Sequence, residues 1–224
     1  MEMILLLLAI ALTIYAQTKI QSTYNRYSKV HNRRGYTGAQ TATQLLMDAG
    51  IYDVRVERVA GNLTDHYDPT HKVLRLSEGV YDSDSIAALG VAAHETGHAI
   101  QHDVGYVPLT LRSIMVPVTN ISSRLAMPLI LIGLLFSSRS YSPLITLGIL
   151  LFAVAVLFSF VTLPVEFNAS KRALDLLESK NFLDSDEIVG ARSVLSAAAL
   201  TYVASAAVAL AQLLRLMAIF GRRD

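Results

Sequence analysis

Two histidines four residues apart, His94 and His98, lie in the run HETGHAIQHD at residues 94–103. On an α-helix this spacing places both imidazoles on one face, one turn apart, so that both rings can reach a single metal ion. Glu95 leans over the same position, which is the HExxH arrangement of zinc hydrolases. Zinc binds neutral imidazole readily, and a catalytic site adds a third protein ligand and a water. The run therefore predicts a zinc site with His94 and His98 as ligands.

The residues around the motif favour a helix that is packed inside protein. Residues 86–93 are apolar and contain no proline, and the serines and aspartates at 82–85 are typical of a helix N-cap. His102 lies one turn beyond His98, but ligands on three successive turns of a straight helix are too far apart for one ion. We therefore expect His102 to pack against or orient the site. The other candidate ligands that remain open are Asp103, Asp175, Glu178, His66 and His71.

The composition narrows the class of protein. Of the 224 residues 53% are hydrophobic, and the mean hydropathy is +0.43, which is high for a water-soluble protein and indicates several membrane segments. The formal net charge is only +1, so the charge does not indicate a nucleic-acid partner. The sequence has no cysteine, which excludes disulfides and thiolate metal ligands and leaves histidines and carboxylates.

Apolar stretches predict where the chain meets a lipid bilayer. We interpret residues 3–16 as an uncleaved anchor and not a signal peptide, because no lysine or arginine precedes them. Residues 114–136 and 144–163 predict a transmembrane hairpin with a polar turn at 137–143, the alternative being a buried hairpin of a soluble protein. Residues 194–220 are rich in alanine and serine, and they predict either a membrane helix that packs on the other spans or a partly buried amphipathic helix.

Glu166 is an acidic residue directly behind the apolar run at 144–163. Pro164 suits the first turn of a new helix, where a glutamate commonly interacts with the positive end of the helix dipole. The alternative interpretation is a third zinc ligand. Because a hairpin crosses the membrane twice, it returns Glu166 to the side that carries His94 and His98, which favours the ligand role.

The segment between the first two apolar stretches has the pattern of a water-facing domain. Residues 37–47 predict a helix, 54–59 and 72–77 alternate like strands, and 65–69 form a turn cluster. The strand at 72–77 could hold an extended peptide along a free edge, or it could be purely structural.

The expected fold class is mainly α: a multi-pass membrane protein with a zincin-like α+β catalytic portion built on a transmembrane helix bundle. The predicted parts are an anchor at 1–18, a catalytic segment at 19–112, a hairpin at 113–163, a helix with Glu166 at 164–193 and a C-terminal helix at 194–224.

The anchor, the HETGHAIQH run, the hairpin and the PVEFNASKRAL segment at 164–174 together resemble the neutral zinc metallopeptidase family of bacterial membrane proteins, the YugP-like proteins, over nearly the whole chain. A more distant similarity is to the HtpX-like membrane metallopeptidases, in which a glutamate of an ExxAD run is a zinc ligand. The resemblance implies one Zn²⁺ per chain, with His94, His98 and Glu166 as ligands and Glu95 as catalytic base. Ser170 stands where the ExxAD run has aspartate, so we expect Ser170, Asp175 or a water to orient a ligand histidine.

The predicted activity is that of a membrane-bound zinc metalloendopeptidase, in which a metal-activated water attacks the peptide bond and Glu95 is the general base. Such sites usually contain a side chain that stabilises the developing oxyanion. The candidates for this role are Tyr67, His66, His71 and Tyr81. Two alternatives remain: a non-catalytic membrane scaffold with structural zinc, and a zinc hydrolase of a non-protein substrate.

The distribution of basic residues predicts the orientation. Lysines and arginines follow the first apolar segment and flank the later ones, whereas the hairpin turn offers only Arg139 on the opposite side. The positive-inside rule then puts the catalytic side in the cytoplasm, although Arg222 and Arg223 contradict this if the last helix spans fully. The expected partners are a protein or peptide substrate and the lipid bilayer, in a role such as membrane protein quality control. The sequence indicates neither an oligomeric state nor a regulator.

Overall fold

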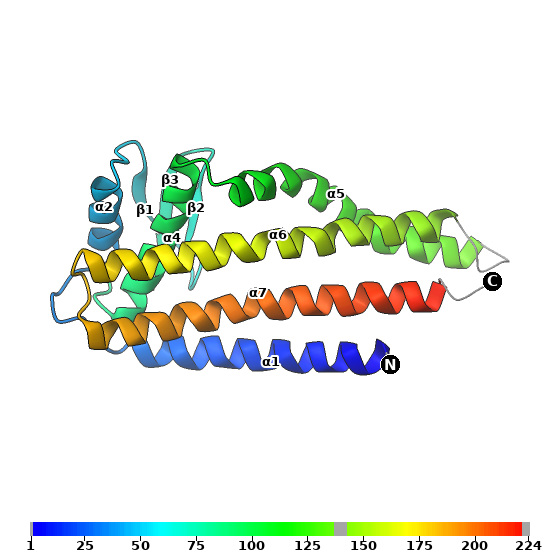
Figure 1. The fold of residues 1–224 in the computed structure, drawn as a ribbon, viewed down its shortest axis with the longest axis horizontal. Helices are drawn as coiled ribbons and strands as arrows, with labels where there is room; N and C mark the ends of the chain where they lie inside the picture. Colours follow the sequence, from blue (N-terminus) through cyan, green and yellow to red (C-terminus); the bar gives the residue numbers. More distant parts are fainter. Residues whose placement is uncertain (1, 137–142, 221–224) are drawn as a thin grey trace.

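The computed structural model describes residues 2–136 and 143–220, and it shows a mainly helical chain with one small sheet at one end (Figure 1). Three helices run lengthwise beside one another, namely α1 (Glu2–Tyr27), α6 (Pro143–Ser179) and α7 (Ser185–Phe220). The second half of α5 (Val107–Phe136) lies alongside α6. Residues 137–142 of the predicted polar turn, with Arg139, and also Arg222 and Arg223 lie outside the described residues.

In the described part of the chain, these four helices are long and apolar enough to cross a membrane. Their large apolar side chains are widely exposed, for example Leu7 at 58% and Leu135 at 78%. Apolar surface of this extent is unfavourable in water but suits a lipid bilayer. A helix also satisfies its own backbone hydrogen bonds, which a membrane-spanning segment requires. The membrane class predicted from the sequence agrees with this arrangement.

The boundaries of four long helices differ from the prediction. α5 begins at Val107, seven residues before the predicted start at 114. α1 has 26 residues and continues past its apolar segment to Tyr27. α6 passes through Pro164 without ending, so the prediction of a new helix at this proline is wrong. In membrane helices a proline is tolerated because neighbouring groups can compensate for the lost backbone hydrogen bond. α7 begins at Ser185, earlier than the predicted start at 194, because Asp186 and Glu187 fit the first turn of a helix.

The water-facing end contains α2 (Gly38–Asp48), β1 (Arg55–Val59), β2 (His66–Asp68), β3 (Val73–Ser77), α3 (Glu78–Tyr81) and α4 (Ile86–Asp103). α2 begins with a capping box, in which the Thr37 side chain accepts from the Gln40 amide and the Gln40 side chain accepts from the Thr37 amide. The predicted strands at 54–59 and 72–77 are confirmed as β1 and β3. β2 occupies the predicted turn cluster, and α3 was not predicted.

The sheet has the order β1-β3-β2, with β3 parallel to β1 and antiparallel to β2. Val73, Leu74 and Arg75 are therefore paired on both sides, so the predicted free edge of this strand is wrong. The burial of β3 explains its central place, since four of its five residues are buried. The edge strand that contacts α4 is β2.

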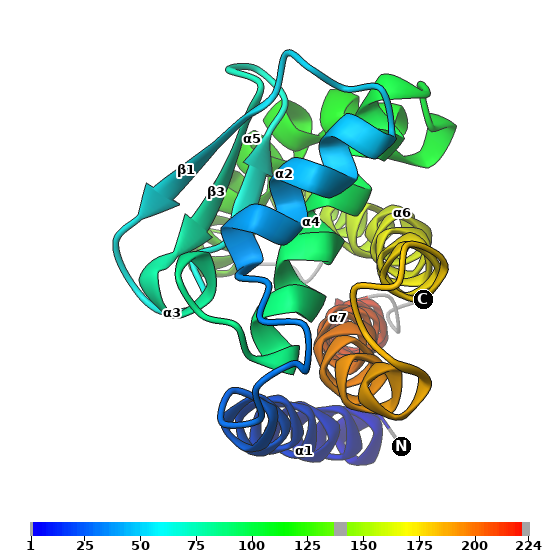
Figure 2. The same ribbon diagram turned by 90° about the vertical axis from the view of Figure 1, so that its left-hand side faces the viewer.

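α4 lies between two groups of elements, the sheet with α2 on one side and α6 with α7 on the other (Figure 2). The residues from Ile86 to Gly90 are all buried, as expected for a helix that is apolar all round. Ser85 caps this helix, because its side chain accepts a hydrogen bond from the Ala88 amide at 3.1 Å. The fold thus holds the helix that carries the histidines in its interior.

Candidate metal centre

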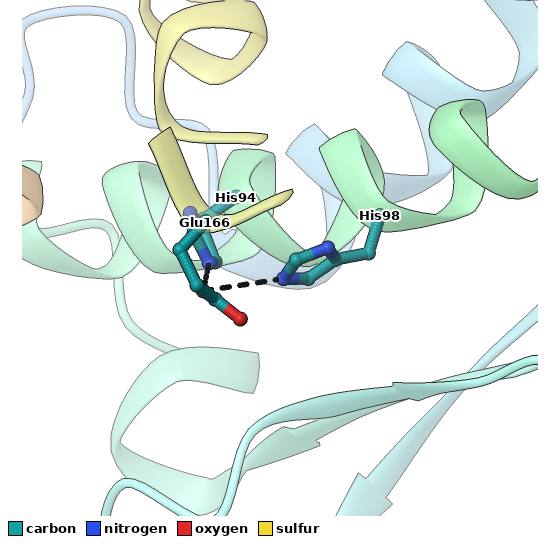
Figure 3. A group of neighbouring side chains, drawn as sticks. All are labelled: His94, His98 and Glu166. Carbon is teal, nitrogen blue, oxygen red and sulfur yellow. Dashed lines mark ion pairs between the residues drawn. The ribbon is translucent and has the colours of Figure 1, made fainter. Parts of the chain in front are cut away.

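α4 and α6 bring together His94, His98 and Glu166, which each offer a ligand atom, all within 4.8 Å of one another (Figure 3). The side chain of Glu166 is only 2% exposed. The two helices pass very closely at Gly97, where an added Cβ atom would lie 2.8 Å from the carbonyl oxygen of Ala169. A glycine at this position therefore allows α6 to approach α4 closely enough for Glu166 to reach the histidines.

The distances between these groups fit a single metal ion. Glu166 Oε2 lies 3.3 Å from His94 Nε2 and 3.6 Å from His98 Nε2. This oxygen is buried and accepts no hydrogen bond from the described residues. Tetrahedral zinc with bonds of about 2.0–2.1 Å would hold its ligand atoms roughly 3.3–3.4 Å apart. The carboxylate oxygen of Glu166, which has no other hydrogen-bond partner among the described residues, faces two imidazole nitrogens. These three atoms together are a set of ligands that suits Zn²⁺.

The far nitrogens of both rings have partners that orient them. Ser170 Oγ lies 3.1 Å from His94 Nδ1, and Gln101 Oε1 lies 3.0 Å from His98 Nδ1. With the ring proton on Nδ1, each histidine donates to its partner and keeps the Nε2 lone pair for a metal. The buried amide of Gln101 is itself held, because it donates to the backbone oxygen of Val165 at 2.8 Å.

Ser170 was predicted from the sequence to orient a ligand histidine, whereas Gln101 was not. Gln101 lies three residues after His98, on the same side of α4, and this spacing was the available signal. Asp175, the other candidate, lines a separate cavity between α6 and α7 and does not belong to the metal group.

A cavity of about 300 Å³ opens beside the three candidate ligands, and Glu95 lies on its wall. β2 and the residues near it contribute Asp65, His66, Tyr67 and Pro69, whereas α5 contributes Leu109, Arg112, Ser113 and Val116. Tyr202 of α7 completes the lining together with the ligands. The site therefore collects side chains from four helices and the sheet, and it has room for a segment of substrate beside Glu95.

Two of the four candidate oxyanion stabilisers, His66 and Tyr67, line this cavity. His71 instead makes a 2.7 Å ion pair with Asp68, and Tyr81 lies under the guanidinium of Arg58. Neither His71 nor Tyr81 is among the lining residues.

His102 is not part of the metal group, as expected, and its Nδ1 lies 2.9 Å from the hydroxyl of Tyr67. Two residues near the ligands were not predicted. Arg112 donates to Glu166 Oε1 at 3.2 Å, and Tyr202 enters the cavity from the alanine-rich α7. An isolated aromatic side chain in a run of small residues was the only sequence signal for Tyr202.

The carboxylates of the site stabilise positively charged groups near them. Burial lowers the pKa of His98, but the nearby carboxylates Glu166 and Glu95 outweigh burial and raise it overall. Burial, together with the charges of neighbouring aspartates, raises the pKa of Tyr67 to about 12, so its hydroxyl stays protonated at neutral pH. Two buried carboxylates beside the ring nitrogens of two imidazoles are an environment in which a divalent cation is stabilised.

Comparison with known proteins identifies the family of this protein. Residues 2–221 match the family described as "Putative neutral zinc metallopeptidase", and the chain belongs to this family. The family resemblance predicted from the sequence is thereby confirmed. The chain is 52% identical, over 212 residues, to the "Putative membrane protease YugP" of Bacillus subtilis (strain 168), and this alignment covers 95% of the chain and 93% of that protein. No solved structure matches.

Proposed function

We propose that the protein is a membrane-bound zinc metalloendopeptidase that hydrolyses peptide bonds with Glu95 as general base. The observation that carries this proposal is the unsatisfied oxygen of Glu166 between the Nε2 atoms of His94 and His98, on the wall of a cavity that also contains Glu95. The family membership and the four apolar helices support a membrane zinc peptidase in general. The residue roles are part of the proposal.

The chemistry divides among a few side chains. Zn²⁺, when bound by the three ligands, would polarise the scissile carbonyl and lower the pKa of a water to about 7. Glu95 accepts the proton of the attacking water and passes it to the leaving amine. The hydroxyl of Tyr67 remains protonated. With the ring proton of His102 on Nδ1, His102 donates to this hydroxyl, which keeps its own proton to donate to the oxygen of the carbonyl as negative charge develops there.

The arrangement supports a catalytic site over a purely structural zinc site. Structural zinc is usually enclosed by four protein ligands, whereas a catalytic site has three and an open position. The metal group in the described residues has three members, and a cavity of about 300 Å³ lies next to them. A scaffold would also have no use for a glutamate on the wall of that cavity.

The setting of the site favours substrates at the membrane surface. Leu109 and Val116 of α5 line the cavity, and α5 is one of the helices apolar enough to span a bilayer. We propose that membrane-embedded or misfolded chains enter along α5 and that the site faces the cytoplasm, in accord with the positive-inside rule.

The substitution Glu95→Gln tests the proposal. The purified variant should bind one equivalent of zinc, as the wild type does, but should cleave casein and a membrane-protein substrate about 10²–10⁴-fold more slowly. The matched control is Glu78→Gln, since Glu78 is an exposed glutamate in the first turn of α3, outside the cavity. This control should retain full activity.

Three outcomes separate the alternatives. Full proteolysis by Glu95→Gln would contradict the role of Glu95. Bound zinc without hydrolysis of any substrate by the wild type would favour the structural scaffold. Zinc-dependent hydrolysis of esters but not of proteins would favour a hydrolase of another substrate class.

A further inference from the structure

A groove of about 700 Å³ lies between α1 and α7, away from the metal centre. Three cationic side chains line it, Lys19 and Arg26 from α1 and Arg192 from α7, and no acidic side chain is among its lining residues. Ser22, Thr23, Ser193 and Ser196 also line the groove, and the hydroxyls of Ser22 and Ser193 donate to backbone oxygens of their own helices. A groove of this composition is complementary to an anion.

In the part of the chain that the structure describes, the cationic side chains of this groove differ from those of the water-facing end in their lack of ion pairs. Most of the latter form ion pairs with carboxylates: Arg33, Arg34, Arg55, Arg58, Lys72, Arg75 and Lys180. Over residues 2–136 and 143–220, Lys19, Arg26 and Arg192 make no such pair, and the guanidinium of Arg26 lies over the ring of Tyr27 at 5.3 Å. Three cations that share a groove without a counter-ion repel one another, so an anionic ligand would be stabilised there.

The groove lies where the apolar parts of both helices begin. α1 and α7 are antiparallel, because Leu6 and Ala9 pack with Ala211 at one end and Gly190 lies against the ring of Tyr27 at the other. Arg26 and Arg192 are therefore near the same level. Lys19 lies two helical turns from Arg26, about 10 Å further into the apolar part. With the apolar parts of α1 and α7 in a bilayer, this level would lie where lipid headgroups meet the acyl chains.

The groove also has an apolar side. Ala197 and Leu200 of α7 line the groove. Both follow Arg192 in the chain and lie toward the apolar part of α7. Val189 lines it on the opposite side of Arg192. On α7 the lining thus changes from the guanidinium of Arg192 to the aliphatic side chains of Ala197 and Leu200, as a phospholipid changes from its phosphate to its acyl chains, whereas on α1 the lining stays polar and ends at Lys19.

We propose that the α1–α7 groove binds one anionic phospholipid, whose phosphate is held by Arg26 and Arg192 and whose acyl chain lies along Ala197 and Leu200. Arginine binds phosphate oxygens through two parallel N–H donors, and Lys19 extends along the groove to a second headgroup oxygen. A free phosphate would use the charges but not the apolar side, so a lipid fits the whole groove better. Arg192 and Ser196 also line the groove between α6 and α7, but Asp175 reduces the positive charge there.

Native mass spectrometry of the detergent-solubilised full chain tests this proposal without using catalysis. The protein is titrated with dioleoyl phosphatidylglycerol and, separately, with dioleoyl phosphatidylcholine, and the first bound equivalent is quantified. The wild type should bind the anionic lipid more tightly. The variant Lys19→Gln/Arg26→Gln/Arg192→Gln should lose about 100-fold in affinity for it, since each cation near a lipid surface contributes about five-fold.

The control Arg55→Gln/Arg58→Gln/Lys180→Gln removes the same charge from exposed ion pairs outside the groove, and it should bind like the wild type. Ser196→Trp keeps all charges and obstructs the exposed groove, so it should weaken lipid binding even if the triple variant does not fold.

Equal binding of both lipids by the wild type would overturn the proposal. So would an unchanged preference in both the triple variant and Ser196→Trp, or full displacement of the lipid by millimolar inorganic phosphate. None of these results bears on Glu95 or zinc, so the failure of this proposal is distinct from the failure of the peptidase proposal.

Discussion

Replacing Gly97 by alanine tests how the metal centre is assembled. The new Cβ atom would lie 2.8 Å from the carbonyl oxygen of Ala169 and 3.2 Å from its Cα atom. Non-bonded heavy atoms rest at about 3.5–4.0 Å, so α6 must withdraw from α4 by on the order of 0.5 Å. Both neighbours of the added methyl group are backbone atoms, which cannot rotate away as a side chain can.

This displacement acts directly on the ligands. Glu166 Oε2 now lies 3.3 Å and 3.6 Å from the two Nε2 atoms, close to the roughly 3.3–3.4 Å spacing of tetrahedral zinc ligands. A further withdrawal of about 0.5 Å would stretch the bonds to zinc. We expect Gly97→Ala to lower zinc affinity about 10–100-fold, as the loss of a ligand-orienting group does, and to cost about 1–3 kcal/mol in unfolding free energy.

Gly90→Ala is the matched control on the same helix. Its Cβ atom would meet the Cβ atom of Ala191 at 3.6 Å, an ordinary contact. Because alanine is favoured over glycine in a helix by about 1 kcal/mol, this variant should be neutral or more stable, with unchanged zinc affinity.

The assays are chelator competition for zinc and thermal unfolding in detergent. Wild-type zinc affinity in Gly97→Ala would refute the conclusion that the close approach at Ala169 sets the position of Glu166. Equal losses in both variants would show that the loss of glycine flexibility, and not this contact, is responsible.

The remaining predictions concern the groups around the ligands. Ser170→Ala should lower zinc affinity about 10-fold because the ring of His94 loses its partner, and chelator competition would show it; an unchanged affinity would contradict an orienting role. Gln101→Leu removes the hydrogen bonds that the buried amide donates to the Val165 carbonyl and to Asn168, so the unfolding free energy should fall by about 1–3 kcal/mol in thermal or denaturant unfolding, and an equally stable variant would refute this. Tyr67→Phe should lower kcat about 10²–10³-fold with zinc content unchanged. Because the pKa of Tyr67 is raised to about 12, the loss should be the same at every pH from about 6 to about 9, and a loss confined to the alkaline end would contradict this role.

Features with a local cause were predictable from the sequence. The capping box of Thr37 and Gln40 and the apolar residues of α4 each depend on side chains a few positions apart. The long apolar helices were recognisable because composition alone decides whether a segment is stable in lipid. The alternation of β1 and β3 was likewise visible, since neighbouring side chains of a strand point to opposite faces.

The errors arose where distant contacts outweigh local preference. β2 has only three residues, and it is a strand because β3 pairs with it. Pro164 commonly marks the start of a helix, but α6 continues through it, packed beside α5 and α7. No pattern within either segment contains this information.

The candidate site also combines features set by local sequence with features set by distant contacts. His94 and His98 can share a metal because one helical turn separates them, and this geometry follows from the backbone of any α-helix. The position of Glu166 depends on how closely α6 crosses α4 at Gly97, and the position of Tyr202 depends on where α7 packs. The sequence by itself predicted the candidate metal-binding pair and the glutamate beside it, and it determined the apolar, membrane-type character of the chain. Only the tertiary structure decided the third ligand's distance, the partners Gln101 and Arg112 and the lining of the cavity, because these depend on contacts between helices far apart in the chain.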